Sequence, residues 1–180
     1  MVISEADIWN MLETVPDPEV PVLSILDLGI VRAVSMSLPE PKQFDNGSNP
    51  LSTSNDPTVT ITITPTYSGC PAMDMISMGI RMKLLENGFK NIQIINQLSP
   101  AWTTDWMSDA GKQKLKAYGI APPLAMHNNT ELFGEEHKIQ CPQCNSFNTE
   151  LVSQFGSTSC KALYRCLDCK EPFDYFKCHR

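Results

Sequence analysis

The 180-residue chain lacks the short motifs that mark the common classes of enzyme. It has no GxGxxG or P-loop glycine-rich segment, no HExxH zinc-protease motif and no GxSxG nucleophile elbow. Its three histidines, His127, His137 and His179, fall outside the predicted hydrophobic core. No pair of side chains suits conventional acid–base catalysis. The sequence therefore gives no support to a conventional catalytic class.

Long apolar segments are absent as well. No run approaches the 18 residues that a membrane-spanning helix needs, so we expect no membrane partner. The first residues, Met1 to Asp7, have neither a basic region nor an apolar region of the kind found in signal peptides. We therefore expect a cytoplasmic protein whose thiols stay reduced.

A dense cluster of basic residues is also missing. The net charge is −6, divided as −8 over residues 1–136 and +2 over residues 137–180. The acidic body would repel phosphates, so we expect no nucleic-acid partner and favour a protein partner. Whether the chain forms a homodimer is left open.

Cysteine is abundant, with seven residues, and four of them form the most specific pattern in the sequence. Cys141 and Cys144 make one CxxC pair, and Cys166 and Cys169 make a second. Two such turns facing each other give a tetrahedral four-thiolate site, which zinc accepts as a closed structural centre. The alternatives are disulfides or four unrelated cysteines. The segment is too small to fold unaided, so bound metal would supply folding energy.

The rest of the pattern predicts an α+β protein with two domains. Residues 1–120 would form a small α/β domain with a three-stranded mixed sheet, residues 121–137 a linker, and residues 138–180 a zinc-ribbon β domain. Residues 37–58, rich in Ser, Asn and Pro, are expected to form a long mobile loop. The expected helices cover residues 4–15, 71–86 and 108–118, and the expected strands cover residues 30–36, 59–64, 91–98, 149–155, 162–165 and 172–178.

Cys70 lies between a predicted strand and a predicted helix, next to Pro71, which suits the start of a helix. Free amides and the helix dipole at such a position favour a thiolate, which could attack an electrophile or hold a metal. The alternative is a small buried cysteine. Asp27 sits among the apolar residues 25–30. A carboxylate there must find a partner or face a cleft, and the simpler interpretation is a turn residue that caps local amides.

Two stretches resemble a known family. Residues 17–19 and 24–31, followed by Thr66-Tyr67-Ser68-Gly69-Cys70-Pro71, are similar to the MIP18 (DUF59) family of iron–sulfur assembly factors, whose motif cysteine corresponds to Cys70. Residues 155–166 and 172–179 add a cysteine-rich tail. The combination resembles the D-subunit (PaaD) family of bacterial phenylacetyl-CoA epoxidases over nearly the whole chain.

This resemblance implies an accessory role in aerobic phenylacetate degradation. The epoxidase is a multicomponent di-iron monooxygenase that converts phenylacetyl-CoA to a ring epoxide. The chain would mature or repair an iron–sulfur or di-iron centre of that complex, with Cys70 as a transient metal or cluster ligand and Asp27 in support. The partners would be other epoxidase subunits, the reductase subunit first among them. The alternative is a non-catalytic scaffold or regulatory subunit that binds the others through its ribbon.

Two questions about metal remain open at this stage. The four-cysteine site could hold zinc or iron, and a transient iron or iron–sulfur cluster is expected at Cys70. Cys160, Cys178 and His179 could form a second metal site or remain free.

Overall fold

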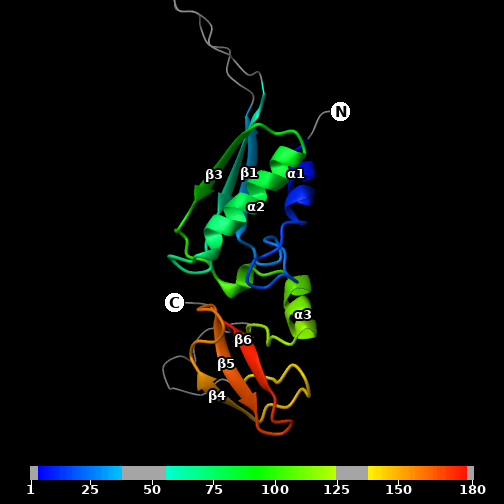
Figure 1. The fold of residues 1–180 in the computed structure, drawn as a ribbon, viewed down its shortest axis with the longest axis vertical. Coiled ribbons are helices and arrows are strands. Elements are labelled where there is room, and N and C mark those ends of the chain that lie inside the picture. The colour runs from blue at the N-terminus through cyan, green and yellow to red at the C-terminus, as the bar shows by residue number, and fades with distance from the viewer. Residues whose placement is uncertain (1–3, 38–55, 125–137, 178–180) are drawn as a thin grey trace, which may run out of the picture.

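The computed structural model describes residues 4–37, 56–124 and 138–177. Most of the expected loop at 37–58, most of the expected linker, and Cys178 and the three histidines lie outside these ranges. Figure 1 shows an elongated molecule with the first sheet and its helices at one end and the second sheet at the other. None of the helices in the described ranges combines the length and apolar character needed to cross a membrane.

The first helix begins where the sequence provides a cap. In α1 (Glu5–Leu12), the Ser4 side chain accepts a hydrogen bond from the Asp7 amide, and the Asp7 carboxylate accepts one from the Ser4 amide. This reciprocal capping box satisfies amides that have no partner within the helix. Ile8 and Leu12, one turn apart, are fully buried and attach the helix to the core.

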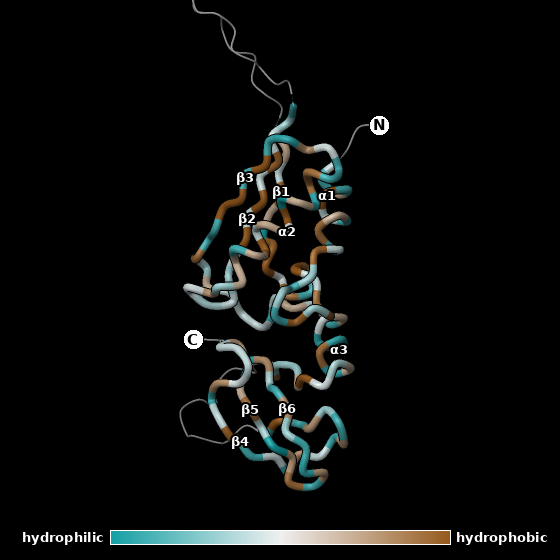
Figure 2. Tube along the Cα trace, in the orientation of Figure 1, coloured by the Kyte–Doolittle hydropathy of each residue, from teal (hydrophilic) through white to brown (hydrophobic). Residues whose placement is uncertain are grey.

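The first sheet has the order β1-β2-β3, with β1 (Val31–Ser37) antiparallel and β3 (Asn91–Asn96) parallel to β2 (Thr58–Ile63). The mixed sheet predicted from the sequence is therefore confirmed. In β2 the buried residues alternate with half-buried threonines, so one face of the strand packs on the core. The face is covered by α1 and by α2 (Ala72–Glu86), and Figure 2 shows hydrophobic residues concentrated in these strands.

Between β3 and the second sheet, the chain forms a short 3₁₀ turn, η1 (Thr104–Trp106), and α3 (Asp109–Tyr118). Ser108 caps α3 and Gly119 ends it with a positive φ of 92°, as the sequence predicts. The Trp102 indole is buried and donates to the Leu28 carbonyl, so this tryptophan packs into the core.

The second sheet is antiparallel throughout and has the order β4-β5-β6. Its strands are β4 (Thr149–Ser153), β5 (Lys161–Cys166) and β6 (Pro172–Phe176). Ala121 pairs with β6, donating its amide to the Asp174 carbonyl and accepting from the Phe176 amide. The first residue of the expected linker is thus part of the ribbon's edge.

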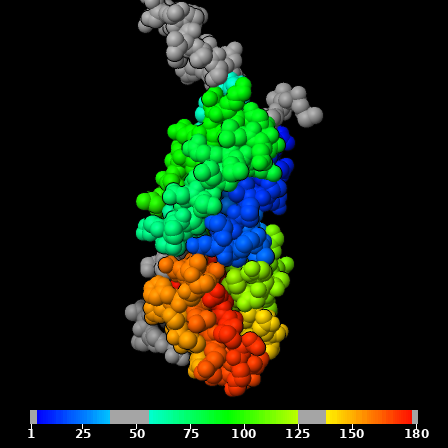
Figure 3. Space-filling model, viewed as in Figure 1, coloured from blue at the N-terminus to red at the C-terminus, as the bar shows by residue number. Residues whose placement is uncertain are grey.

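The two sheets are not separate bodies. Phe176, at the end of β6, is buried in the core of the first domain, where its ring meets Trp102 edge to face at 6.2 Å. Cys160 belongs to the same cluster. Figure 3 shows the ribbon, in orange and red, packed directly against the N-terminal body. This contact brings residues of the ribbon close to the loop that carries Cys70.

Candidate metal-binding sites

The two CxxC segments form matching turns in the ribbon. In the first turn the Asn145 amide donates to the Cys141 carbonyl, and the Cys141 amide donates to the Ser146 carbonyl. The residue after each pair, Asn145 or Lys170, has a positive φ of 60° or 69°. The reversal directs both sulfurs of each turn toward a common point.

The four sulfurs converge. The Sγ atoms of Cys141, Cys144, Cys166 and Cys169 all lie within 4.8 Å of one another. The Cys141–Cys169 and Cys144–Cys166 sulfur pairs are 3.8 and 3.5 Å apart. A tetrahedral zinc with Zn–S bonds of about 2.3 Å requires sulfurs about 3.8 Å apart. The donor set and its spacing therefore fit a four-thiolate metal centre.

The sulfurs differ in how readily they form thiolate. Although amide hydrogen bonds oppose them, burial and the neighbouring thiols raise the pKa of Cys144 and raise the pKa of Cys169 to about 12, whereas the pKa of Cys166 is lowered. Amide hydrogen bonds from Cys169 and then from Asp168 lower the pKa of Cys166 to about 7, although burial opposes them. The Asp168 carboxylate accepts hydrogen bonds from Ser146 and from Asn148, which follow the first turn. Those two bonds also lower the Asp168 pKa. Asp168 thus ties the two CxxC turns together around the centre, as outer-shell groups do in metal sites.

Cys70 lies on the loop that joins β2 to α2, two residues before the helix begins. Its carbonyl accepts from the Met73 amide, and Pro71 occupies the cap position, so Cys70 sits beside the N-cap as predicted from the sequence. The thiol is partly exposed. It lines a narrow pocket together with Asp17 and Glu19 of the N-terminal segment and Cys160 of the ribbon.

The groups around this pocket are tightly connected. The Cys160 thiol lies 3.5 Å from Glu19 Oε2 and 3.0 Å from the Thr158 hydroxyl. Burial, with the Glu19 charge adding to it, raises the Cys160 pKa to about 12. Burial first and then interaction with Cys70 raise the Tyr67 pKa, while interaction with Ser159 of the ribbon lowers it. The Cys70 loop and the ribbon therefore share a polar contact.

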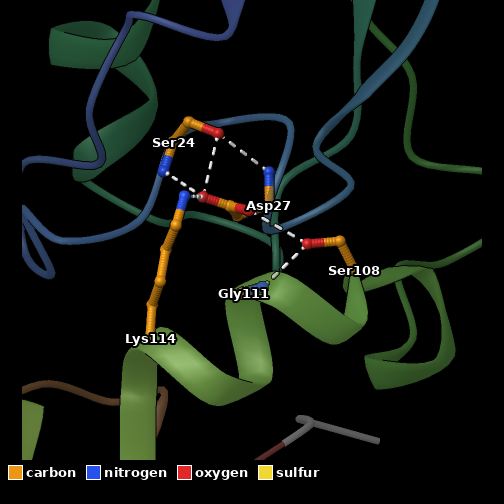
Figure 4. Close-up of polar contacts among 5 residues, drawn as sticks. All are labelled: Ser24, Asp27, Ser108, Gly111 and Lys114. Atoms are coloured by element: carbon orange, nitrogen blue, oxygen red, sulfur yellow. Dashed lines mark hydrogen bonds and ion pairs between the residues drawn. The ribbon is translucent and has the colours of Figure 1, made fainter. Parts of the chain in front are cut away.

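Asp27 lies elsewhere and has partners for both oxygens (Figure 4). Its Oδ2 accepts from the Ser24 amide at 3.0 Å and from Lys114 Nζ at 2.6 Å, and its Oδ1 accepts from the Ser108 hydroxyl at 2.9 Å. Burial raises its pKa, but these bonds outweigh it, and the net shift is downward. Asp27 does not line the Cys70 pocket. Its contacts match the simpler interpretation, a turn residue that caps amides, and they also hold α3.

Sequence reasoning therefore located the four-cysteine group and Cys70 but missed the acidic groups beside Cys70. Asp17 and Glu19 belong to a stretch that carried the family resemblance, and this was the available signal. The closeness of Cys160 to Glu19 spans 141 positions of sequence, and no local pattern could indicate it. Cys178 and His179, suggested as partners of Cys160, lie outside the described residues.

Comparisons with known proteins identify the ribbon and a relative of nearly the whole chain. Residues 125–177 match a family model described as the PaaD zinc beta ribbon domain. Over 172 residues the chain is 46% identical to the D-subunit of the "Putative 1,2-phenylacetyl-CoA epoxidase" of Escherichia coli K12. The match spans 96% of this chain and 92% of that protein.

Other known proteins match a shorter part of the chain. Over 113 residues the chain is 34% identical to an "Fe-S protein maturation auxiliary factor" of Porphyromonas gingivalis, spanning 62% of this chain and 90% of that protein. A crystal structure of a DUF59 domain from Bacillus anthracis aligns with a TM-score of 0.48 and 26% identity, over 62% of this chain and 90% of that one.

Identity at this level, over nearly the full length of both proteins, settles the family. The chain belongs to the PaaD family and has that family's zinc-ribbon domain at its C-terminal end.

Proposed function

We propose that the chain is an accessory subunit of the phenylacetyl-CoA epoxidase system that matures or repairs an iron–sulfur or di-iron centre of the complex. The observation that carries the proposal is Cys70. It is partly exposed beside the start of α2, in the domain that is similar to an iron–sulfur maturation factor. The reductase subunit is the proposed client, and the proposed compartment is the cytoplasm, where thiols stay reduced.

The proposed chemistry is ligand exchange. Cys70 loses its proton and donates a sulfur electron pair to incoming iron, which is the cargo. On transfer, the bond between iron and Cys70 breaks as a bond from iron to a client thiolate forms, and the proton released by the client thiol returns to Cys70. No electron changes hands, so the step needs neither oxidant nor reductant. Partial exposure of the Cys70 thiol allows a client to approach it.

In this proposal the ribbon has a structural role. Cys141, Cys144, Cys166 and Cys169 would hold a structural zinc, which closes the ribbon and contributes folding energy when it is bound. A centre with four protein ligands has no open position, so substrate has no place to bind there. The ribbon's proposed task is to present the first domain to its client.

The test is the metal content of the reductase subunit produced together with this chain. Cys70→Ser should fold normally and keep the ribbon's metal, yet the reductase should lack iron and acid-labile sulfide. Ser68→Ala, on the same loop, is the matched control and should leave the reductase fully loaded. If the reductase produced together with the Cys70→Ser variant has a normal content of iron and acid-labile sulfide, the proposal is refuted.

A second candidate function is a scaffold or regulatory subunit, and the surface of the ribbon favours it. Four large apolar side chains in and around β4 are about half exposed or more: Phe147 54%, Leu151 48%, Val152 54% and Phe155 60%. Exposed apolar groups of this kind mark protein contacts. For a pure scaffold, Cys70→Ser would be silent, whereas Val152→Asp would abolish co-purification with the other subunits.

A further inference from the structure

The junction of the two domains encloses a small pocket with unusual chemistry. Its walls include two thiols, Cys70 and Cys160, and two carboxylates, Asp17 and Glu19, with apolar residues such as Ile76 and Phe176 around them. The free space, about 10 Å³, is that of one water-sized species. The pocket is therefore too small for an iron–sulfur cluster, but it has room for a single ion.

The spacing of two of these groups suits metal coordination. Cys160 Sγ and Glu19 Oε2 are 3.5 Å apart. In a tetrahedral site with metal–sulfur bonds of about 2.3 Å and metal–oxygen bonds of about 2.1 Å, sulfur and oxygen lie about 3.6 Å apart. An ion could thus bind both atoms with little movement of either. The backbone is fixed here, because the Cys160 carbonyl accepts from the Lys177 amide at 2.9 Å.

Negative charge predominates around the pocket, which favours a divalent cation. Lys161 is buried, with its ammonium 3.4 Å from the Glu19 carbonyl oxygen. Two thiolates and the Glu19 carboxylate carry three negative charges, which a divalent ion and Lys161 would neutralise, and the Asp17 carboxylate adds a fourth when it is ionised. Buried charges require such compensation. Asp17, 6% exposed, accepts its hydrogen bonds from the Glu19 and Val20 amides on Oδ1, and its Oδ2 accepts none among the described residues.

Cys70 approaches from the opposite domain. Among the described residues, only the four ribbon cysteines form a group whose potential ligand atoms all lie within 4.8 Å of one another. Cys70, Cys160 and Glu19 do not form such a group, so the Cys70 sulfur lies more than 4.8 Å from at least one of the other two ligand atoms. Tyr67, three residues earlier on the same loop, interacts with both Cys70 and Ser159. Cys70 lines the same pocket as Cys160 and Glu19, so the proposed site requires its sulfur to move toward them when an ion binds.

We propose that Cys70, Cys160 and Glu19 form a second metal site across the domain junction, which holds one thiophilic divalent ion such as Fe²⁺. Binding forms two metal–sulfur bonds and one metal–oxygen bond, displaces water from the ion and releases the two thiol protons to solvent without redox change. The inference rests on the proposed function, since it identifies the cargo held at Cys70 as a single ion with a ribbon thiolate as its second ligand.

Cobalt provides the test, because thiolate-to-cobalt charge-transfer absorption increases with the number of bound thiolates. The full chain, with its ribbon site filled by zinc, is titrated anaerobically with Co²⁺. We expect one further equivalent to bind, with about half the charge-transfer intensity of the cobalt-substituted four-thiolate ribbon, two thiolates against four. Cys160→Ser and Cys70→Ser should each weaken this binding at least about tenfold, since even loss of outer-shell partners has that effect.

Two further variants make the test decisive. Cys178→Ser is the matched control, because it removes a cysteine of the same tail that the site does not use, and it should leave the second cobalt in place. Glu19→Gln should weaken binding while both thiols remain. In a separate preparation of each variant with cobalt in the ribbon site, the spectrum of that site reports that the domain is folded.

The inference is overturned if no second equivalent binds, if the second band survives Cys160→Ser, or if it depends on Cys178 instead of Cys70. These outcomes are independent of the maturation assay. If the reductase produced together with Cys70→Ser has its normal metal content, the proposed function is refuted. If the second cobalt still binds to Cys160→Ser, only the junction site is refuted.

Discussion

Replacing Phe176 by alanine should detach the ribbon from the first domain. Phe176 is the last residue of β6, and only 2% of it is exposed. Its ring packs in the core of the first domain against Trp102. The side chain thus links two parts of the chain that each have a sheet of their own. Truncation leaves a cavity at the junction and removes the aromatic contact.

The expected loss follows from measured classes of substitution. A buried phenylalanine replaced by alanine costs about 3–5 kcal/mol, and an edge-to-face aromatic pair accounts for about 0.5–1.5 kcal/mol of such a loss. A domain of this size is stable by about 5–15 kcal/mol, so the substitution removes a large share. The metal centre still holds the ribbon's own fold, and we therefore expect two unfolding transitions where the wild type shows one.

Urea unfolding followed by tryptophan fluorescence and by far-UV circular dichroism measures the effect. Phe147→Ala is the matched control, since Phe147 is 54% exposed and its loss should change the free energy of unfolding by less than about 0.5 kcal/mol. If Phe176→Ala lowers the free energy of unfolding by less than about 1 kcal/mol, or leaves a single transition of unchanged midpoint, then the two domains are not coupled through this ring.

Four other substitutions test separate parts of the structure. Cys166→Ser, or removal of metal by a chelator, should melt β4 to β6 while the first sheet stays folded, as amide exchange would report; protection retained in the ribbon would contradict the metal assignment. Asp27→Asn should cost about 2 kcal/mol at pH 7 in chemical unfolding, because hydrogen bonds to a charged group are lost. The Asp27 pKa is lowered by folding, so its stabilisation is complete above the unfolded value, about 3.9. The stabilisation disappears as pH falls through the pKa that Asp27 has in the folded state. The difference in unfolding free energy between the wild type and Asp27→Asn should therefore be smaller at pH 3 than at pH 7. A difference that does not change with pH would refute the argument. Gly111→Ala should lower the stability of the protein in thermal unfolding, because its Cβ would lie only 2.9 Å from Asp27 Cβ. Gly79→Ala is the control and should be close to neutral, because its Cβ would lie 3.2 Å from a single Val15 methyl group. Equal effects of the two substitutions would show that the contact between α3 and Asp27 is loosely packed.

Much of the fold could be predicted because its signals are local. The cap at Ser4, the alternation in β2 and the glycine at position 119 each fix an element through the residues beside it. The parallel pairing of β2 with β3 followed from the strand–helix–strand connection between them. The four-cysteine group was predictable because each CxxC turn carries its own geometry.

The junction could not be predicted in this way. Phe176 reads as one more apolar residue of a ribbon strand, and only tertiary packing reveals that it is buried against Trp102. The same holds for Cys160 beside Glu19. For Asp27, the sequence required a partner for the carboxylate but could not identify Lys114, which lies 87 positions away. These contacts depend on how the two domains meet, which no local pattern records.

The central claim is that Cys70 passes iron to a partner, and transfer of labelled iron tests it most directly. The full chain loaded anaerobically with ⁵⁵Fe²⁺ is mixed with the metal-free reductase subunit, and the two proteins are then separated and counted. The account predicts that label moves from the wild-type chain to the reductase and that Cys70→Ser transfers no more than free iron does. Equal transfer from Cys70→Ser and the wild type, or no transfer from either, would contradict it.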